Sequence, residues 1–192
     1  MNISREEASA ALDSIHEADR KVAQRRSYAY AAPFLILWGL VWALCNGISD
    51  LAPRWSDRAW MAGNVLGAAV SIYLIVALVL RERRTCTNRA ASREMGRRFA
   101  LLGIACWSYF IAMFLVLGPM TGRRTGVFVS LFWTIAYMAA GAWIGARLFI
   151  IGLVATIAIV LGYLFVEQHF ALWMAVFGGG ALIAGGLWLR RL

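Results

Sequence analysis

The chain has 192 residues, enough for one domain of ordinary size, and 61% of them are apolar against 15% charged. Soluble domains are about 45–50% apolar, so this composition excludes a water-soluble globular fold and makes lipid the main solvent of the chain. The net charge of +9 does not indicate nucleic-acid binding, because the basic residues stand at the ends of apolar segments, where membrane-topology signals stand.

The first predicted unit, residues 1–27, is an amphipathic helix outside the bilayer. Ser4 and Glu7 have the spacing of a capping box. Apolar residues then recur at alternating spacings of three and four, which places them on one stripe of a helix. They are Ala8, Ala11, Ile15, Ala18 and Val22, with Leu12 beside them. We expect no cleavable signal sequence, because the segment is polar and the apolar run after it is too long for a signal-peptide core.

Six apolar segments follow, each close to the roughly 20 residues that cross about 30 Å of hydrocarbon. They span residues 29–48, 60–80, 99–118, 126–145, 148–166 and 170–189. The fourth and fifth are continuous except for Gly145 and Arg147, and a single helix would leave Arg147 in lipid. We therefore predict a tight hairpin there. The expected fold is an all-α integral membrane protein, with a six-transmembrane-helix bundle over residues 28–192 and a basic cytosolic loop at 81–98.

The basic residues predict the orientation of this bundle. With the N-terminus inside, fifteen of the 19 basic residues fall in inner segments and four, Arg54, Arg58, Arg123 and Arg124, in outer loops. This positive-inside bias predicts that both termini are cytosolic. Among the basic residues only Lys21 is a lysine, which we interpret as the codon usage of a GC-rich bacterial genome. The expected location is a bacterial cytoplasmic (inner) membrane.

Small residues predict where the helices touch, because backbones approach closely in lipid where side chains are absent. They lie in four of the segments: Gly39, Ala43 and Gly47; Gly63 and Gly67; Gly141 and Gly145; and Gly178, Gly179, Gly180, Ala184, Gly185 and Gly186. These stripes fit packing within one bundle, or an interface with a second copy in a homo-oligomer.

Polar residues near the outer surface form the first candidate site. They are Asn46, Asp50, Asn64, Ser130, Thr134, Glu167 and His169. Together they could line a shallow ligand pocket open to the outside. Alternatively, the hydroxyls and amides bond across helices or to their own backbone, for about 0.6 kcal/mol each. Glu167 and His169 also have the composition of half a metal site or of an acid–base pair, but one histidine and one carboxylate in a short loop are better explained as solvated loop residues.

The second candidate site is a docking surface on the cytosolic side. Residues 1–19 hold five acidic residues against one basic residue, whereas residues 81–98 hold seven arginines against two glutamates. The proposed contact residues are Leu12, Ile15, Arg83, Arg84, Arg89 and Arg93. The helix would dock onto its own loop, onto another protein or onto the membrane. Helices that bind anionic lipid normally have a basic polar face, so the acidic face favours a protein contact.

Catalytic chemistry has little support in this sequence. No apolar segment carries an ionisable residue near its centre, where a charge costs several kcal/mol and is usually kept for function. No hydrolase, metalloprotease or nucleotide-binding motif occurs, so we expect no enzyme, no catalytic residue, no metal and no cofactor.

Two functions therefore remain as hypotheses. The first is a non-enzymatic regulatory or scaffolding membrane protein whose partners are the lipid bilayer and a cytosolic or membrane protein. The second is a passive carrier or channel for a small solute or lipid, using the outer polar residues. In helix number and length the chain resembles many small bacterial six-helix membrane proteins, but no motif in it is specific enough to assign the function of a known family to this chain.

Overall fold

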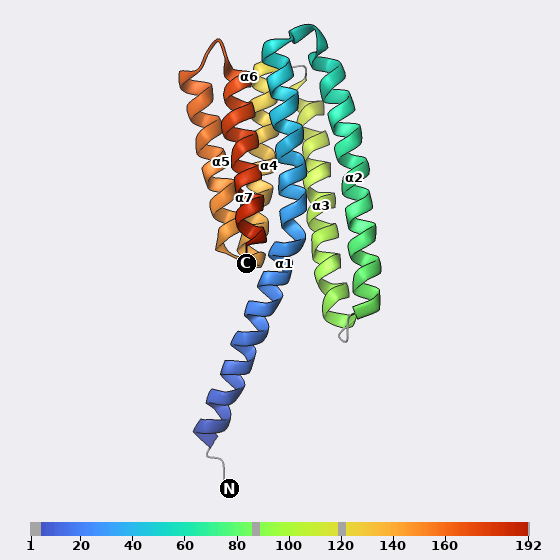
Figure 1. Ribbon diagram of the computed structural model, residues 1–192, viewed down its shortest axis with the longest axis vertical. Helices are drawn as coiled ribbons and strands as arrows, with labels where there is room; N and C mark the ends of the chain where they lie inside the picture. Colours follow the sequence, from blue (N-terminus) through green and yellow to red (C-terminus); the bar gives the residue numbers. More distant parts are fainter. Residues whose placement is uncertain (1–4, 86–88, 119–121, 192) are drawn as a thin grey trace.

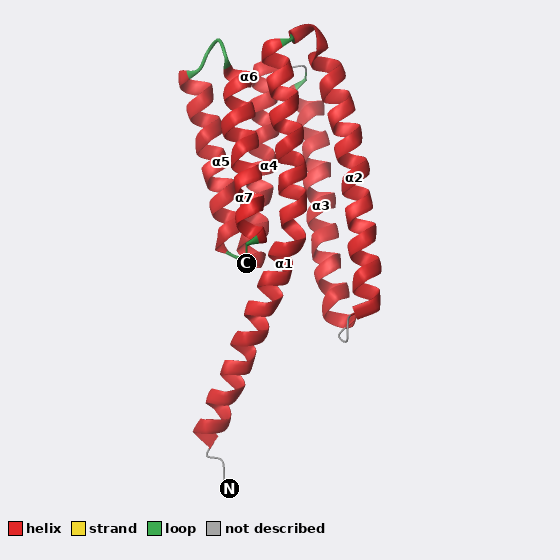
Figure 2. Ribbon diagram, in the orientation of Figure 1, coloured by secondary structure: helices red, strands yellow, loops and turns green. Residues whose placement is uncertain are grey.

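The computed structural model describes residues 5–85, 89–118 and 122–191, and all regular structure in these ranges is helical (Figure 2). The elements in chain order are α1 (Arg5–Leu51), η1 (Pro53–Trp55), α2 (Ser56–Thr85), α3 (Arg89–Leu117), α4 (Gly122–Ile144), α5 (Ala146–Phe165), α6 (Phe170–Trp173), η2 (Met174–Gly179) and α7 (Gly180–Arg190). The last three run on from one another as one long helix. The prediction of an all-α fold is confirmed.

Within these ranges, five helical segments are long and apolar enough to cross a membrane. They are Ala11–Leu51, Pro53–Leu80, Gly122–Ile144, Ala146–Phe165 and Phe170–Arg190. In α3 the apolar stretch, Gly103–Val116, is shorter than these five. Several helices of this length and composition make the chain a multi-pass membrane protein.

Helix α1 lies at the centre of the packing and makes its most extensive contacts with α7 and η2. These contacts are close because glycines meet backbone. A Cβ added at Gly179 would lie 2.8 Å from the amide nitrogen of Ala43 and 2.8 Å from the carbonyl oxygen of Gly39. Gly186 similarly leaves room for the carbonyl oxygen of Ala32. The predicted small-residue contacts between the first and last helices therefore form within one chain.

The remaining small residues divide between contacts and open space. Gly63 lies against Cys45, and Gly67 lies under the ring of Trp38, whose indole nitrogen donates a hydrogen bond of 3.2 Å to Ser71. These contacts hold α2 to α1. Gly47, by contrast, has open space where a side chain would be. A periodic glycine in the sequence thus does not always mark a helix contact.

Gly145 makes the turn between α4 and α5, as predicted from Arg147. Helix α4 ends at Ile144 and α5 begins at Ala146, and Gly145 between them has φ of 145°, a conformation that residues with a Cβ rarely adopt. A side chain here would also meet Gln24 and Tyr28 of α1. The two helices then pack closely along their length, with Gly141 against the backbone of Phe149.

Helix α3 packs against α4 through aromatic rings. The ring centroids of Trp107 and Trp133 are 6.0 Å apart with an edge-to-face geometry, and those of Phe110 and Phe132 are 5.4 Å apart. Such pairs contribute about 0.5–1.5 kcal/mol beyond their buried area. Large side chains therefore join these two helices, whereas glycines join α1 to η2 and α7.

The long helix at the C-terminal end contains a π-helical segment, Met174–Gly179. The wider turn is accompanied by a bond outside the helix, because the indole nitrogen of Trp173 donates a hydrogen bond of 2.8 Å to the carbonyl oxygen of Ala158 in α5. The Trp173 ring also occupies the space where Gly162 has no side chain. π-Helical turns are rare, and this one directly follows the residue that contacts α5.

Two expected boundaries differ in the structure. The helix expected to end within residues 1–27 continues without a break into the bundle as α1, because the residues from Gln24 to Ala32 include no glycine or proline that would end a helix. Pro33 does lie inside α1, and the helix changes direction where it leaves the bundle (Figure 1). The expected loop 81–98 is largely helical, since α2 continues to Thr85 and α3 starts at Arg89.

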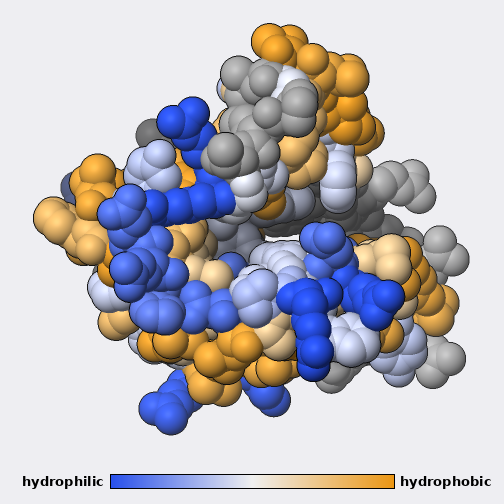
Figure 3. Space-filling view, turned by 90° about the horizontal axis from the view of Figure 1, so that it is seen from above, coloured by the Kyte–Doolittle hydropathy of each residue, from blue (hydrophilic) through white to orange (hydrophobic). Residues whose placement is uncertain are grey.

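The two ends of the bundle carry different helix connections. The α4–α5 turn and the C-terminus lie at the end where α1 leaves the bundle, and the α1–α2 and α5–α6 connections lie at the opposite end (Figure 1). Seen from that opposite end, hydrophilic side chains gather on the face and apolar side chains form much of its rim (Figure 3). This is the distribution expected of a bundle whose sides face lipid.

Candidate functional site

Asp50 and His169 are the two predicted outer residues that the structure pairs. Nδ1 of His169 lies 3.0 Å from Oδ2 of Asp50, although the residues are 119 positions apart. The Asp50 side chain is 9% exposed and that of His169 is 70% exposed. The contact joins the end of α1 to the residue before α6. Glu167 is exposed and is not part of this pair.

The other outer residues do not share a pocket with this pair. Asn46 donates a hydrogen bond to the carbonyl oxygen of Trp42 in its own helix, and Asn64 lies on the exposed face of α2. Ser130 is buried and Thr134 is 1% exposed. The Thr134 hydroxyl accepts a 2.8 Å hydrogen bond from Thr156 of α5, a partner that the sequence analysis missed. Asn46 and Thr134 thus have hydrogen-bond partners within the protein and Ser130 is buried, whereas Asn64 is exposed.

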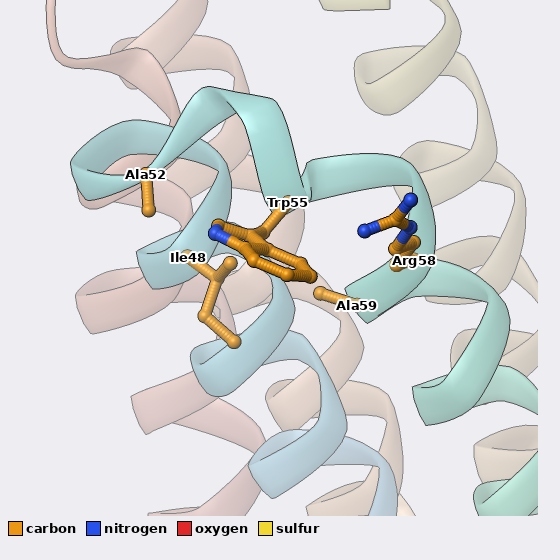
Figure 4. A pocket seen from close by; sticks show the side chains of 5 residues that line it. All are labelled: Ile48, Ala52, Trp55, Arg58 and Ala59. Carbon is orange, nitrogen blue, oxygen red and sulfur yellow. The ribbon is translucent and has the colours of Figure 1, made fainter.

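An apolar depression of about 450 Å³ occupies the corner between α1, η1 and α2 at this end. It is lined by Ile48, Ala52, Trp55, Arg58 and Ala59 (Figure 4). The Trp55 ring lies over the depression, and the guanidinium carbon of Arg58 is 4.9 Å from the centre of that ring. None of the polar residues predicted for an outer pocket lines it, and its apolar walls offer a ligand little besides hydrocarbon contact.

Arg123 has a structural role that its position in an outer loop did not indicate. Its Nη2 donates hydrogen bonds to the carbonyl oxygens of Tyr163, at 2.7 Å, and Val166, at 3.0 Å. Its guanidinium also lies over the rings of Tyr163 and Phe170. The side chain therefore caps the last turn of α5, where helix carbonyls have no partner within the helix and a positive charge is favourable.

The N-terminal part of α1, residues 5–23, extends beyond the bundle, and we refer to it as the N-terminal arm (Figure 1). Every residue from Ala11 to Ala23 is exposed. The apolar stripe is therefore uncovered, with Leu12 56%, Ile15 55% and Val22 65% exposed. At about 1.5 Å per residue the arm is about 28 Å long.

The polar side of the arm carries its charges. Lys21 forms an ion pair of 2.7 Å with Glu17, one helical turn earlier, and this contact lowers the pKa of Glu17 below its ordinary value of 4.5. The arginines predicted to receive the arm, Arg83, Arg84, Arg89 and Arg93, have side chains outside the described part of the chain. Figure 1 nevertheless shows the arm well apart from the ends of α2 and α3. Docking of the arm onto these arginine side chains stays a prediction.

At the base of the arm, a cavity of about 160 Å³ is lined by Lys21, Gln24, Arg25, Tyr28 and Arg147. None of these five residues was predicted from the sequence to line a site. Gln24 Nε2 donates a hydrogen bond of 3.0 Å to the Tyr28 hydroxyl, and the guanidinium carbon of Arg147 lies 5.2 Å from the centre of the Trp188 ring. A signal was present in the sequence, since Arg147 is a lone charge between two apolar segments, and the structure places it in the first turn of α5, directly after the Gly145 turn.

In the described part of the chain, no three histidine, cysteine, aspartate or glutamate residues are placed to hold a metal ion. No protein-family model, no curated protein and no solved structure matches the chain.

Proposed function

We propose that the chain is a non-enzymatic docking protein of a bacterial inner membrane, with six membrane-crossing helices and both termini in the cytosol. The sixth crossing is α3, whose apolar stretch is the short one. An even number of crossings brings both termini to one side. The basic residues Arg25, Arg147 and Arg190 then belong to the cytosolic end, as the positive-inside rule requires.

The exposed stripe of the N-terminal arm supports docking. The side chains of Leu12, Ile15 and Val22 expose apolar surface, which is unfavourable in water. A helix packed against this stripe would bury that surface. The alternating spacing of three and four is the pattern by which two helices pack side by side. The arm has no such partner among the described residues.

The charge of the arm indicates the kind of partner. Residues 5–23 hold five acidic residues against three basic ones, Arg5, Arg20 and Lys21. This negative net charge repels both an anionic membrane surface and the same arm of a second copy. We therefore propose a basic, amphipathic helical segment of another protein as the occupant. Its basic residues would pair with Asp19, which follows the stripe residue Ala18 and is exposed beside the stripe, and its apolar face would cover the stripe.

Site-specific photocrosslinking in native membranes tests this proposal. A photoreactive amino acid placed at Leu12, Ile15 or Val22 should give one protein adduct of discrete mass, while the same amino acid at Asp13 or Arg20, on the opposite face, should not. The crosslinked peptide of the partner should be basic, the adduct should weaken at high salt, and Ile15→Glu should abolish it. Adducts only with lipid, only with a second copy, or equally from both faces would contradict the proposal.

Removal of residues 1–20 separates docking from the carrier hypothesis. This deletion keeps Gln24 and Tyr28, so the packing of α1 on the α4–α5 turn is retained. A docking protein should lose its function with the arm, whereas a carrier should keep most of its flux. The carrier hypothesis has less support, because Asn46, Asn64, Ser130 and Thr134 line neither of the two cavities described above.

A further inference from the structure

The cavity at the base of the N-terminal arm gathers positive charge from two parts of the chain that are far apart in sequence. Lys21 and Arg25 come from α1, one helical turn apart, and Arg147 comes from the first turn of α5. Of the three, only Lys21 has an acidic partner among the described residues, Glu17. Like charges brought together in this way repel one another unless an anion lies between them.

Arg147 is the residue that most needs a partner. Its Nη1 atom is buried and has no hydrogen-bond acceptor in the described structure. A buried donor without an acceptor is costly, and more so when the group is charged. The ring of Trp188 covers the guanidinium, but a π face does not replace an in-plane acceptor. An anion in the cavity would supply that acceptor.

The backbone adds to the same potential. Helix α5 starts at Ala146 with Gly145 before it, and no side chain caps its N-terminus. The N-terminal end of a helix carries partial positive charge and free N–H groups, so an arginine in its first turn is unfavourable unless a negative charge is present. The Tyr28 hydroxyl already accepts a hydrogen bond from Gln24, which leaves its own hydrogen available to donate.

We propose that this cavity binds the phosphate group of an anionic phosphate ester. Arg147 and Arg25 would bind the phosphate oxygens, and Lys21 and Tyr28 would complete the set of donors. One water needs about 10–15 Å³ of such space, so about 160 Å³ accommodates a tetrahedral oxyanion and part of its ester substituent. The planar guanidinium groups suit phosphate geometry, because they donate two parallel hydrogen bonds.

The depth of the cavity favours a lipid headgroup as the source of this phosphate. It lies at the end of the apolar helices, where Tyr28 lines it and the Trp188 ring covers the guanidinium of Arg147; tyrosine and tryptophan are the residue types enriched at headgroup level. Basic pockets between helices on the cytoplasmic side are typical sites for anionic headgroups. A soluble phosphate ester from the cytosol would offer the same chemistry, and the experiment distinguishes the two.

Native mass spectrometry of the full chain in detergent gives the direct test. The protein is titrated with short-chain phosphatidylglycerol, with short-chain phosphatidylcholine and, separately, with glycerol phosphate. The wild-type chain should bind phosphatidylglycerol more tightly than phosphatidylcholine. Arg147→Gln removes at least one charged hydrogen bond and should weaken phosphatidylglycerol binding about tenfold or more. Arg190→Gln removes the same charge at the same end, outside the cavity, and should leave the affinity unchanged within about twofold.

The outcomes distinguish a lipid headgroup from a soluble phosphate ester, and they also test whether the cavity binds an anionic phosphate group. Binding of phosphatidylglycerol without binding of glycerol phosphate identifies a lipid headgroup, whereas binding of glycerol phosphate that displaces the lipid identifies a soluble ester. Equal affinity in Arg147→Gln and Arg190→Gln, or no preference for phosphatidylglycerol, overturns the proposal. Arg25→Gln, at an exposed position, guards against misfolding of Arg147→Gln and should also weaken binding. The proposal does not depend on the docking function, because no arm partner is present in this experiment.

Discussion

The contact between α1 and η2 allows a steric test with a built-in control. Gly179 and Gly180 are neighbours in one helix, yet a Cβ at Gly179 would lie 2.8 Å from backbone atoms of α1, whereas a Cβ at Gly180 would have no neighbour within 4 Å. An alanine at either position gains about the same helix propensity, roughly 0.8–1 kcal/mol over glycine. The difference between the two variants therefore isolates the cost of pushing the helices apart.

We expect Gly179→Ala to lower the free energy of unfolding by about 1–3 kcal/mol relative to Gly180→Ala, the usual cost of overpacking a close contact. Backbone atoms of Gly39 and Ala43 cannot turn aside as a side chain would. At about 3 °C per kcal/mol for a chain of this size, the thermal midpoints should differ by on the order of 3–9 °C. Thermal unfolding in a mild detergent, followed by circular dichroism, measures this difference. Equal midpoints would refute the close approach of α1 and η2.

Three further predictions concern other contacts. Arg123→Ala should destabilise the chain by about 1–3 kcal/mol and Arg123→Lys should rescue only part of it, since an ammonium can donate to both carbonyls as Nη2 does but has no planar face to lie over Tyr163 and Phe170; chemical unfolding in detergent measures both. Thr134→Val should cost only about 0.6 kcal/mol in the same assay, because Thr156 keeps its bond to the Gly152 carbonyl, and a loss of several kcal/mol would contradict this assignment. Lys21→Gln should raise the pKa of Glu17 toward 4.5, which an NMR titration measures. In the wild type, the stabilisation of the arm helix by this ion pair should be present above pH 4.5 and be lost as the pH falls through the lowered pKa of Glu17. An unchanged Glu17 pKa in the variant would show that the pair does not form in solution.

The helical class and the α4–α5 turn could be predicted from the sequence because each depends on a strong local energy. Twenty apolar residues in a row leave few options in lipid, since the backbone must satisfy its own hydrogen bonds. A single arginine at position 147 was enough to indicate the turn, because the alternative would leave its charge in hydrocarbon. Gly145 then supplied the one backbone conformation that the turn needs.

The helix ends outside the lipid could not be predicted in the same way. Residues in the N-terminal arm and at the ends of α2 and α3 are polar and charged, and such residues read as a separate helix or a loop by composition. Many of them are nevertheless good helix formers, and nothing in residues 24–32 interrupts the helix. Hydropathy indicates where lipid ends, but it does not indicate where a helix ends.

The candidate sites were harder to predict from the sequence than the helix ends, because each site is formed by residues far apart in the chain. Asp50 and His169 were each identified, but only the packing of α1 against α6 brings them within 3.0 Å. The cavity that joins Lys21, Arg25 and Arg147 was missed for the same reason. A charge assigned to topology can also form a binding site, and sequence alone gives it only the first role.

The N-terminal arm and the part of α1 inside the bundle belong to one continuous helix. The same helix that carries Leu12 and Ile15 outside the bundle carries Gly39 and Ala43 inside it, against η2. For an arm of about 28 Å, a tilt of ~10° at its base moves the tip by ~5 Å. A partner at the tip and an anion at the base would thus contact one continuous helix, and a partner that changes the tilt of the arm would change the affinity of the anion by the same factor as the anion changes that of the partner.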